Sequence, residues 1–153
     1  MRTEHFKAIP RRPGAVIFLH WLTLVALLGA VLLILVRDEF DGRELRYWLL
    51  DAHRYLGLLV FALLFARLVT RYRHRLSILV EASRLATLAA SLIHFALYVL
   101  LATVPLLGWA ASNALGQDVH FLGVPLPVLE KPDDDLGDRL QEWDKTAAWS
   151  LLA

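Results

Sequence analysis

Cysteine is absent from the 153 residues of this chain. Its absence excludes structural disulfides, iron–sulfur clusters held by cysteine, covalent haem attached through a CxxCH motif, thiol catalysis and zinc sites built on cysteine. Metal chemistry is therefore left to the six histidines and to the carboxylates.

Charge is the second scarcity, because only 20% of the residues are charged, whereas 58% are hydrophobic and the mean hydropathy is +0.51. Soluble domains are about half apolar, so this composition favours a single membrane bundle over residues 1–153. The basic residues flank apolar runs instead of lining one surface, which gives no support to nucleic-acid binding. The apolar runs also lack the chains of carboxylates that proton relays use.

The longest apolar run extends from Gly14 to Val36 and contains one titratable side chain, His20. A helix of this length rises about 1.5 Å per residue and covers the ~30 Å hydrocarbon core, so we expect a first transmembrane span at residues 14–36. Arg11 and Arg12 precede the run, but it is longer than the apolar region of a cleaved signal peptide, and no small-x-small cleavage site follows it. We therefore expect this span to remain in the membrane.

Two further spans are expected at about 47–70 and 85–111, the second of them with a kink at Pro105. Arginines cluster in the connection between these spans, residues 72–84, and basic residues also fill the leader, residues 1–13. By the positive-inside rule both basic segments, and with them the N-terminus, lie on the cytoplasmic side. The other two connections then lie outside.

A helical pattern returns at about residue 140, but the chain ends at Ala153 before a full span is complete. The apolar part of this segment is far shorter than the ~17–25 residues that a span needs, so it is an interfacial helix or the opening of a truncated fourth span. We favour truncation, because no cap or basic stop follows the apolar residues. In the preceding loop we expect the acidic run 133–135 to be solvated and His120 to be a surface residue.

This topology assigns a depth to each histidine of the spans. His20 and His94 both lie about two turns or more from the cytoplasmic side and share an inner tier, whereas His53 occupies an outer tier, level with Asp144. Single imidazoles spaced in this way suit a pigment held between helices, with each imidazole ligating iron at right angles to a porphyrin plane. For any one histidine alone, a hydrogen bond to a neighbouring helix is the simpler interpretation, but three in one small bundle favour ligation.

Two sets of residues accompany these histidines. Gly57 follows His53 by one helical turn and either leaves room for a flat ligand or serves helix packing. Arg67 and Arg71 are one turn apart at the inner end of the second span, where they would pair with an acidic ligand group such as a haem propionate. A position at the cytoplasmic end of a helix explains these arginines about as well, because positive charge there orients the span and arginine side chains can reach the membrane surface.

Three stretches of the chain resemble the prokaryotic cytochrome b561 family and the related b-type subunits of membrane hydrogenases. The first is LHWLTL around His20, and the second is AHRYLGLLVFALLFARLVTR in the second span. The third is IHFALYVLLATVPLLGW. Together they extend over about residues 11–149, and the family positions that they match are His20, His53, Gly57, Arg67, Arg71, His94, Tyr98, Pro105, Gly108 and Trp109.

The resemblance implies a four-helix integral protein of the bacterial inner membrane that holds two b haems and carries electrons between the quinone pool and a partner. The inner haem would use His20 and a histidine of the fourth span. The outer haem would use His53 and a histidine at the start of the fourth span. His94 would not be an axial ligand in this scheme, but would contact an inner-haem propionate or a quinone.

The chain departs from this pattern at two points. Asp144 stands where the second outer ligand is expected, and a carboxylate is a poor axial ligand for a low-spin b haem. The second inner ligand would lie beyond Ala153. An alternative pair for one haem is His20 with His94, which share a tier.

Two hypotheses about function follow. The first is an electron carrier similar to cytochrome b561, with His20 and His53 as iron ligands, in contact with lipid, quinone and either a redox partner protein or a second copy of the chain. The second is a haem-free membrane scaffold or small subunit that kept the bundle and lost the cofactor.

Overall fold

The computed structural model of the protein describes residues 14–74 and 84–152. This part of the chain folds into four α-helices and one short antiparallel β-hairpin, so the predicted all-α membrane bundle is confirmed. Within the described residues, the first three helices are long and apolar enough to cross a membrane. The elements are α1 (Gly14–Arg37), α2 (Arg43–His74), α3 (Arg84–Ala114), β1 (His120–Phe121), β2 (Val124–Pro125) and α4 (Asp134–Leu152).

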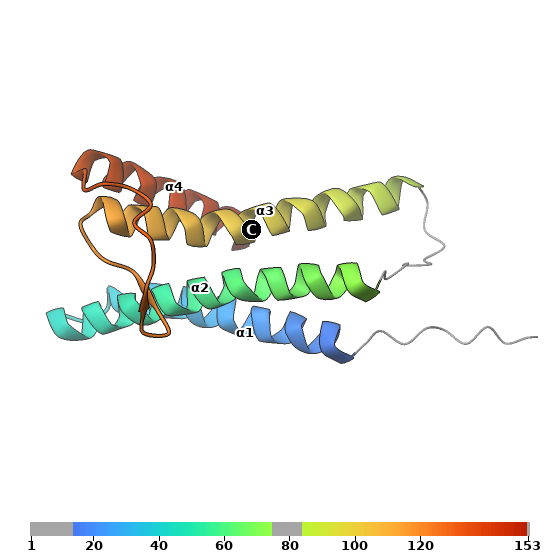
Figure 1. The fold of residues 1–153 in the computed structure, drawn as a ribbon, viewed down its shortest axis with the longest axis horizontal. Coiled ribbons are helices and arrows are strands. Elements are labelled where there is room, and N and C mark those ends of the chain that lie inside the picture. Colours follow the sequence, from blue (N-terminus) through green and yellow to red (C-terminus); the bar gives the residue numbers. More distant parts are fainter. Residues whose placement is uncertain (1–13, 75–83, 153) are drawn as a thin grey trace, which may run out of the picture.

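The helices associate as two pairs, α1 with α2 and α3 with α4 (Figure 1). Helix α2 also packs on α3 and so joins the pairs, whereas the described part of α4 approaches neither α1 nor α2 within 8 Å between Cα atoms. Helix α4 lies beside the half of α3 that carries the later residues of that helix (Figure 1). The start of a fourth helix that the sequence predicts is therefore present, and it packs on the later half of α3. The basic leader, residues 1–13, and most of the basic connection, residues 75–83, are outside the described residues.

Small side chains allow α1 and α2 to approach closely. Ala26 and Ala30 on α1 are buried, and a Cβ atom added to Gly29 would lie 3.0 Å from the Cδ1 atom of Leu56. Ala26 joins the main apolar cluster, in which buried residues of α1, α2 and α3 meet at the middle of the bundle. Interfaces between membrane helices use small residues in this way, because dispersion forces between closely packed backbones replace the hydrophobic effect.

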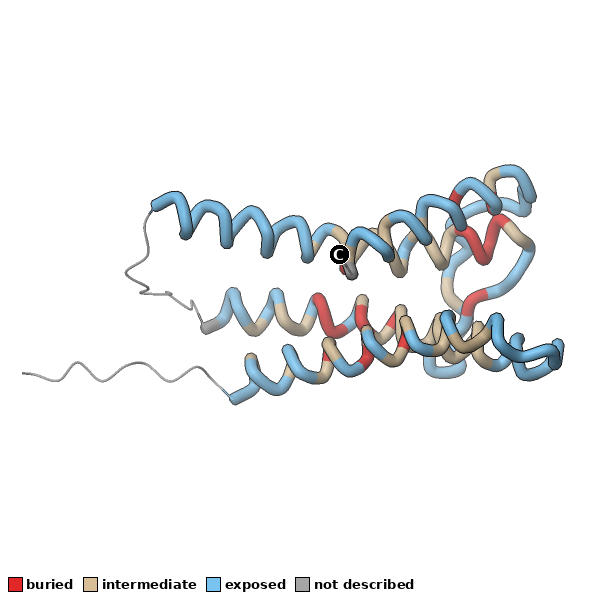
Figure 2. Tube along the Cα trace, turned by 180° about the vertical axis from the view of Figure 1, so that it is seen from behind, coloured by how far each residue is buried: buried red, intermediate tan, exposed pale blue. Residues whose placement is uncertain are grey.

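Large apolar side chains cover the outside of the bundle. Phe18 and Phe95 are about two-thirds exposed, and every residue from Arg84 to Leu97 is classed as exposed. Figure 2 shows the first half of α3 in the colour of exposed residues, with buried residues confined to the middle of the bundle and to the end at which α3 and α4 are connected. Such a surface suits contact with acyl chains, which agrees with the predicted membrane location.

The register of α4 against α3 is set by the loop that connects them. The Asn113 side chain accepts a hydrogen bond from the Leu129 backbone N–H (2.9 Å), and the Asp133 N–H donates to the Ala114 carbonyl (2.8 Å). Asp133 then caps the helix, because its side chain accepts a bond from the Leu136 N–H (3.1 Å). The expected acidic run therefore begins with a capping residue.

Candidate functional site

His53 has a fixed orientation between α2 and α1. Its imidazole is half-buried, and Nδ1 lies 2.8 Å from the carbonyl oxygen of Ala30. A carbonyl only accepts, so Nδ1 carries the hydrogen and Nε2 keeps its lone pair. Within the described part of the chain, Nε2 has no hydrogen-bond partner. An imidazole held by a carbonyl through one nitrogen, with the other available, is the usual state of a histidine that ligates a metal.

The helix face that follows His53 has room. Gly57 lies one turn further along α2, and a Cβ atom added to it would meet no heavy atom within 4 Å. This glycine is unlike Gly29, whose added Cβ atom would press on Leu56. The space beside Gly57 is therefore not filled by a neighbouring helix in this structure.

Asp144 lies on the face of α4 that packs on α3. Its carboxylate approaches Gly108, whose added Cβ atom would lie 3.8 Å from Oδ2. The side chain is half-buried, and Oδ1 has no hydrogen-bond partner among the described residues. The buried indole N–H of Trp109, next to Gly108, also lacks a partner. Buried polar atoms without partners are rare and costly, so these two atoms lower the stability of the folded chain.

The inner tier is less enclosed. His20 and His94 are both exposed, and α1 and α3 make no close backbone contact with each other in the described residues. The Nδ1 atom of His94 lies 2.6 Å from the carbonyl oxygen of Ala90 on its own helix. The ring of His20 contacts that of Trp21, at 6.0 Å between centroids. The structure thus leaves both imidazoles accessible and does not pair them directly.

Tyr98 on α3 contacts both Arg67 and Arg71 near the end of α2. Arg71 donates a hydrogen bond from Nη1 to the Tyr98 hydroxyl (3.3 Å), and the Arg67 guanidinium carbon lies 5.9 Å from the centre of the Tyr98 ring. Both contacts cross from α2 to α3 and so contribute to the joint between the helix pairs. The sequence placed Tyr98 one turn after His94 but did not indicate that it would hold these arginines, because the contact depends on how α2 and α3 dock.

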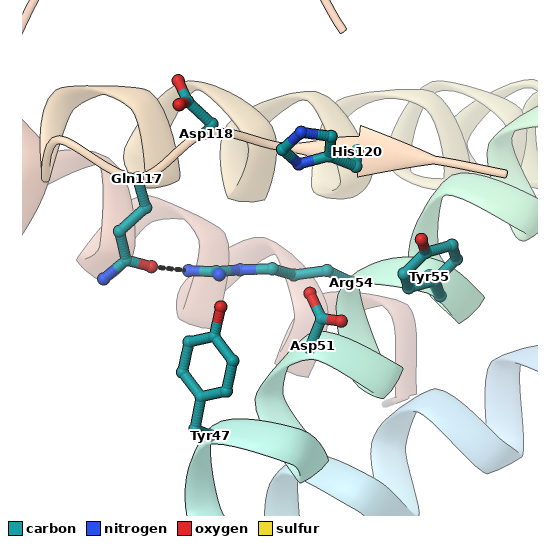
Figure 3. A pocket seen from close by; sticks show the side chains of 7 residues that line it. All are labelled: Tyr47, Asp51, Arg54, Tyr55, Gln117, Asp118 and His120. Carbon is teal, nitrogen blue, oxygen red and sulfur yellow. Dashed lines mark hydrogen bonds between the residues drawn. The ribbon is translucent and has the colours of Figure 1, made fainter. Parts of the chain in front are cut away.

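A polar pocket of about 380 Å³ opens at the outer end of α2 (Figure 3). The segment that follows α3 folds back over this end of the helix, where Arg54 donates a hydrogen bond to the Gln117 side-chain oxygen and Tyr55 contacts Phe121 at 6.3 Å between ring centroids. His120 is exposed, as expected, but it also lines this pocket, which sequence reasoning missed. The lining residues are Tyr47, Asp51, Arg54, Tyr55, Gln117, Asp118 and His120.

The described residues contain no cluster of three or more histidine, cysteine, aspartate or glutamate side chains able to hold a metal ion. A conventional zinc or iron centre built only from protein side chains therefore has no support in this part of the chain. Single imidazoles on separate helices are instead the arrangement that a porphyrin needs, because the macrocycle supplies the four equatorial nitrogens itself.

Comparisons with known proteins agree with the resemblance. Residues 11–153 match the family model described as prokaryotic cytochrome b561. The chain is also 30% identical over 122 residues to cytochrome b561 homolog 1 of Escherichia coli (strain K12), an alignment that covers 78% of this chain and 69% of that protein. The matched residues include all four helices of the structure.

Proposed function

Since this chain belongs to the prokaryotic cytochrome b561 family, we propose that it passes electrons between the quinone pool and a redox partner across the bacterial inner membrane, with its N-terminus on the cytoplasmic side. The coarser statement needs no proposal: the family is one of membrane electron carriers with b-type haem, and the chain has three helices able to span the membrane. The observation that carries the finer proposal is the His53 imidazole, whose Nδ1 is held by Ala30.

At the outer site we propose His53 as the axial ligand. The Ala30 carbonyl fixes the tautomer and orientation of its ring, which spares a bound haem the cost of ordering the ligand. The space beside Gly57 suits the edge of a flat macrocycle. On this side the residues fit a haem. On the side of α4, the described residues Asp134–Leu152 include no second imidazole.

At the inner site we propose His20 as the axial ligand. His94 has an exposed ring and a predicted depth in the same tier as His20, so His94 either contacts a propionate or a quinone, or ligates the same iron as His20. Arg67 and Arg71 supply the positive charge for a propionate, and Tyr98 orients both guanidinium groups while leaving several of their N–H donors available.

A haem bound at these sites would supply one-electron redox chemistry, and the protein would set its potential through the axial imidazoles, the dry surroundings and the nearby positive charge. Electron transfer requires no bond-making side chain, so none of the residues named here is catalytic. The partner is either a separate redox protein or a second copy of this chain.

A haem-free scaffold or small subunit is the second candidate. Asp144 is the observation that favours it, because by the family resemblance it stands at the position of the second outer ligand, and its Oδ1 atom is buried without a hydrogen-bond partner among the described residues. In this case contacts between the helices would stabilise the bundle without a bound cofactor.

One measurement separates the two functions. The full chain is expressed with added haem precursor and purified in detergent, and its spectrum is recorded oxidised and after dithionite. We expect a Soret band and a reduced α band, each weakened in His20→Ala and in His53→Ala but unchanged in the control His120→Ala. Protein without either band would reject the cytochrome. Full bands in both variants would reject these ligands.

A further inference from the structure

The polar pocket beside the start of α2 has no role in the haem sites proposed above. Its walls include Asp51 and Arg54 of α2, and Gln117, Asp118 and His120 of the segment that follows α3 (Figure 3). Its volume of about 380 Å³ is several times the volume that one water molecule occupies. The pocket can therefore hold a polar group of several heavy atoms.

The charged side chains of this pocket do not neutralise one another. Asp51 and Arg54 are neighbours on one face of α2, and Asp118 lines the opposite wall. In the part of the chain that the structure describes, none of these three side chains forms an ion pair. The Arg54 guanidinium donates from one nitrogen to the Gln117 side-chain oxygen, which leaves its other N–H donors available. The pocket thus presents free donors and free carboxylate acceptors to one ligand.

The pocket lies at the depth of a bilayer surface. His53 is next to Arg54 in sequence and is level with Ala30 on α1, because Nδ1 lies 2.8 Å from the Ala30 carbonyl oxygen. Helix α1 continues for only about 10 Å beyond Ala30, so the pocket lies near the end of the hydrocarbon core. Tyr47 and Trp48, at the same end of α2, are 62% exposed, as is usual for aromatic residues at a membrane–water interface. Phospholipid headgroups are therefore within reach.

A headgroup with charges of both signs complements these side chains. A phosphate would accept hydrogen bonds from Arg54, since guanidinium groups pair well with phosphate. A primary ammonium would donate its N–H groups to the carboxylates of Asp51 and Asp118. A quaternary ammonium has no N–H to donate, and a headgroup without an ammonium would leave both carboxylates unpaired. These side chains therefore favour a phosphate joined to a primary ammonium.

We propose that the polar pocket binds the headgroup of phosphatidylethanolamine, with the phosphate on Arg54 and the ammonium on Asp51 and Asp118. The hairpin beside the pocket also exposes Leu122 and Val124, which offer apolar surface to the acyl chains of the bound lipid. This site needs no haem and lies beyond the proposed function. A failure of the lipid proposal would leave that function untouched.

The test measures lipid binding to the full wild-type chain in dodecyl maltoside by native mass spectrometry. Dioleoyl phosphatidylethanolamine is titrated in parallel with its N-methyl, N,N-dimethyl and N,N,N-trimethyl forms, the last of which is phosphatidylcholine. The series removes one N–H donor at a time and keeps the phosphate. We expect the affinity for one bound lipid to fall stepwise, by at least about tenfold from first to last. Equal affinity throughout the series, or tighter binding of phosphatidylglycerol, would overturn the proposal.

Substitutions locate the site on the protein. Asp51→Asn and Asp118→Asn each remove a negative charge with little change of shape, so each should reduce the preference for phosphatidylethanolamine over phosphatidylcholine. Arg54→Gln should weaken both lipids equally, because both carry the phosphate. The matched control Glu44→Gln changes an exposed carboxylate in the first turn of α2 that does not line the pocket, and it should leave both affinities unchanged. An unchanged preference in both aspartate variants, with normal helical circular dichroism, would contradict the assignment.

Two competitors test the source of the headgroup. Glycerophosphoethanolamine has the same headgroup without acyl chains and should not displace the lipid at equal concentration. Displacement would assign the pocket to a free zwitterion and reject the lipid. Binding of a short-chain quinol in preference to phosphatidylethanolamine, abolished by Asp118→Asn, would also reject it. Neither result reports on haem, which the oxidised and reduced spectra test separately.

Discussion

The Nδ1 atom of His53 on α2 lies 2.8 Å from the carbonyl oxygen of Ala30 on α1. This carbonyl belongs to a helix interior, so it accepts the imidazole N–H in addition to its place in the helix. The contact joins the packing of the first helix pair to the orientation of the proposed outer ligand, because the hydrogen bond depends on the distance between α1 and α2.

Substitution of Ala30 should therefore disturb haem binding through His53, although Ala30 is not proposed to contact the haem itself. Ala30 is 5% exposed, so Ala30→Leu overpacks the α1–α2 contact at a cost of about 1–3 kcal/mol. We expect a lower midpoint of thermal unfolding in detergent and a reduced haem content. The control Leu32→Ala changes an exposed residue of the same helix. An Ala30→Leu protein with normal haem content would show that the His53 contact has no role in holding the cofactor.

Gly57 and Gly29 should respond to enlargement in opposite ways. Gly57→Leu fills open space, so haem-free protein should keep its stability while haem content falls. Gly29→Leu meets Leu56 and should lower stability by about 1–3 kcal/mol, with haem or without it. Thermal unfolding followed by circular dichroism, together with haem content from the reduced spectrum, separates the two effects. Equal loss of stability in both variants would contradict the proposal that the space beside Gly57 is open for a flat ligand.

The Tyr98 contacts can be divided between ring and hydroxyl. Tyr98→Phe keeps the face beneath Arg67 and removes the bond from Arg71, so we expect a loss of about 0.5–1.5 kcal/mol. Tyr98→Leu should lose this amount and also the cation–π contact, worth about 0.5–1 kcal/mol at an exposed site. A double-mutant cycle with Arg71→Gln measures the coupling. Additive effects of Tyr98→Phe and Arg71→Gln would mean that the hydrogen bond contributes nothing in detergent.

The outer pocket should depend on the bond between Arg54 and Gln117. Arg54→Gln removes this connection, so the segment from Gln117 through the hairpin should exchange its amide hydrogens faster. Arg43→Gln, at the exposed start of α2, is the control. The haem spectrum should be unchanged, because His53 is held by α1 and not by this pocket. A spectral change in Arg54→Gln would show that the pocket and the proposed haem site are coupled.

Removal of the Asp144 carboxylate should stabilise the haem-free protein. A buried acceptor without a donor costs about 1–3 kcal/mol, and Asp144→Leu replaces it with an apolar group on an apolar face. The midpoint of thermal unfolding of haem-free protein in detergent should rise. A lower midpoint would indicate that the carboxylate has a stabilising partner in the folded protein.

The sequence by itself determined the class of the protein and its three apolar helices, and it predicted a depth for each histidine. Hydropathy over a helix-length window is a local property, so Gly14–Arg37 and the apolar parts of α2 and α3 could be recognised without knowledge of their neighbours. The same reasoning identified Asp144 as the residue that departs from the family pattern, since motif order and spacing alone carry that comparison.

Only the tertiary structure decided which helices pair and which side chains meet. The contacts of Tyr98 with Arg67 and Arg71, and of His53 with Ala30, join residues on different helices. Such contacts depend on the rotation and separation of the helices, which close packing of small residues sets and which hydropathy does not encode. For the same reason the sequence predicted His120 only as a surface residue: its place in the outer pocket exists because the loop after α3 folds back onto α2.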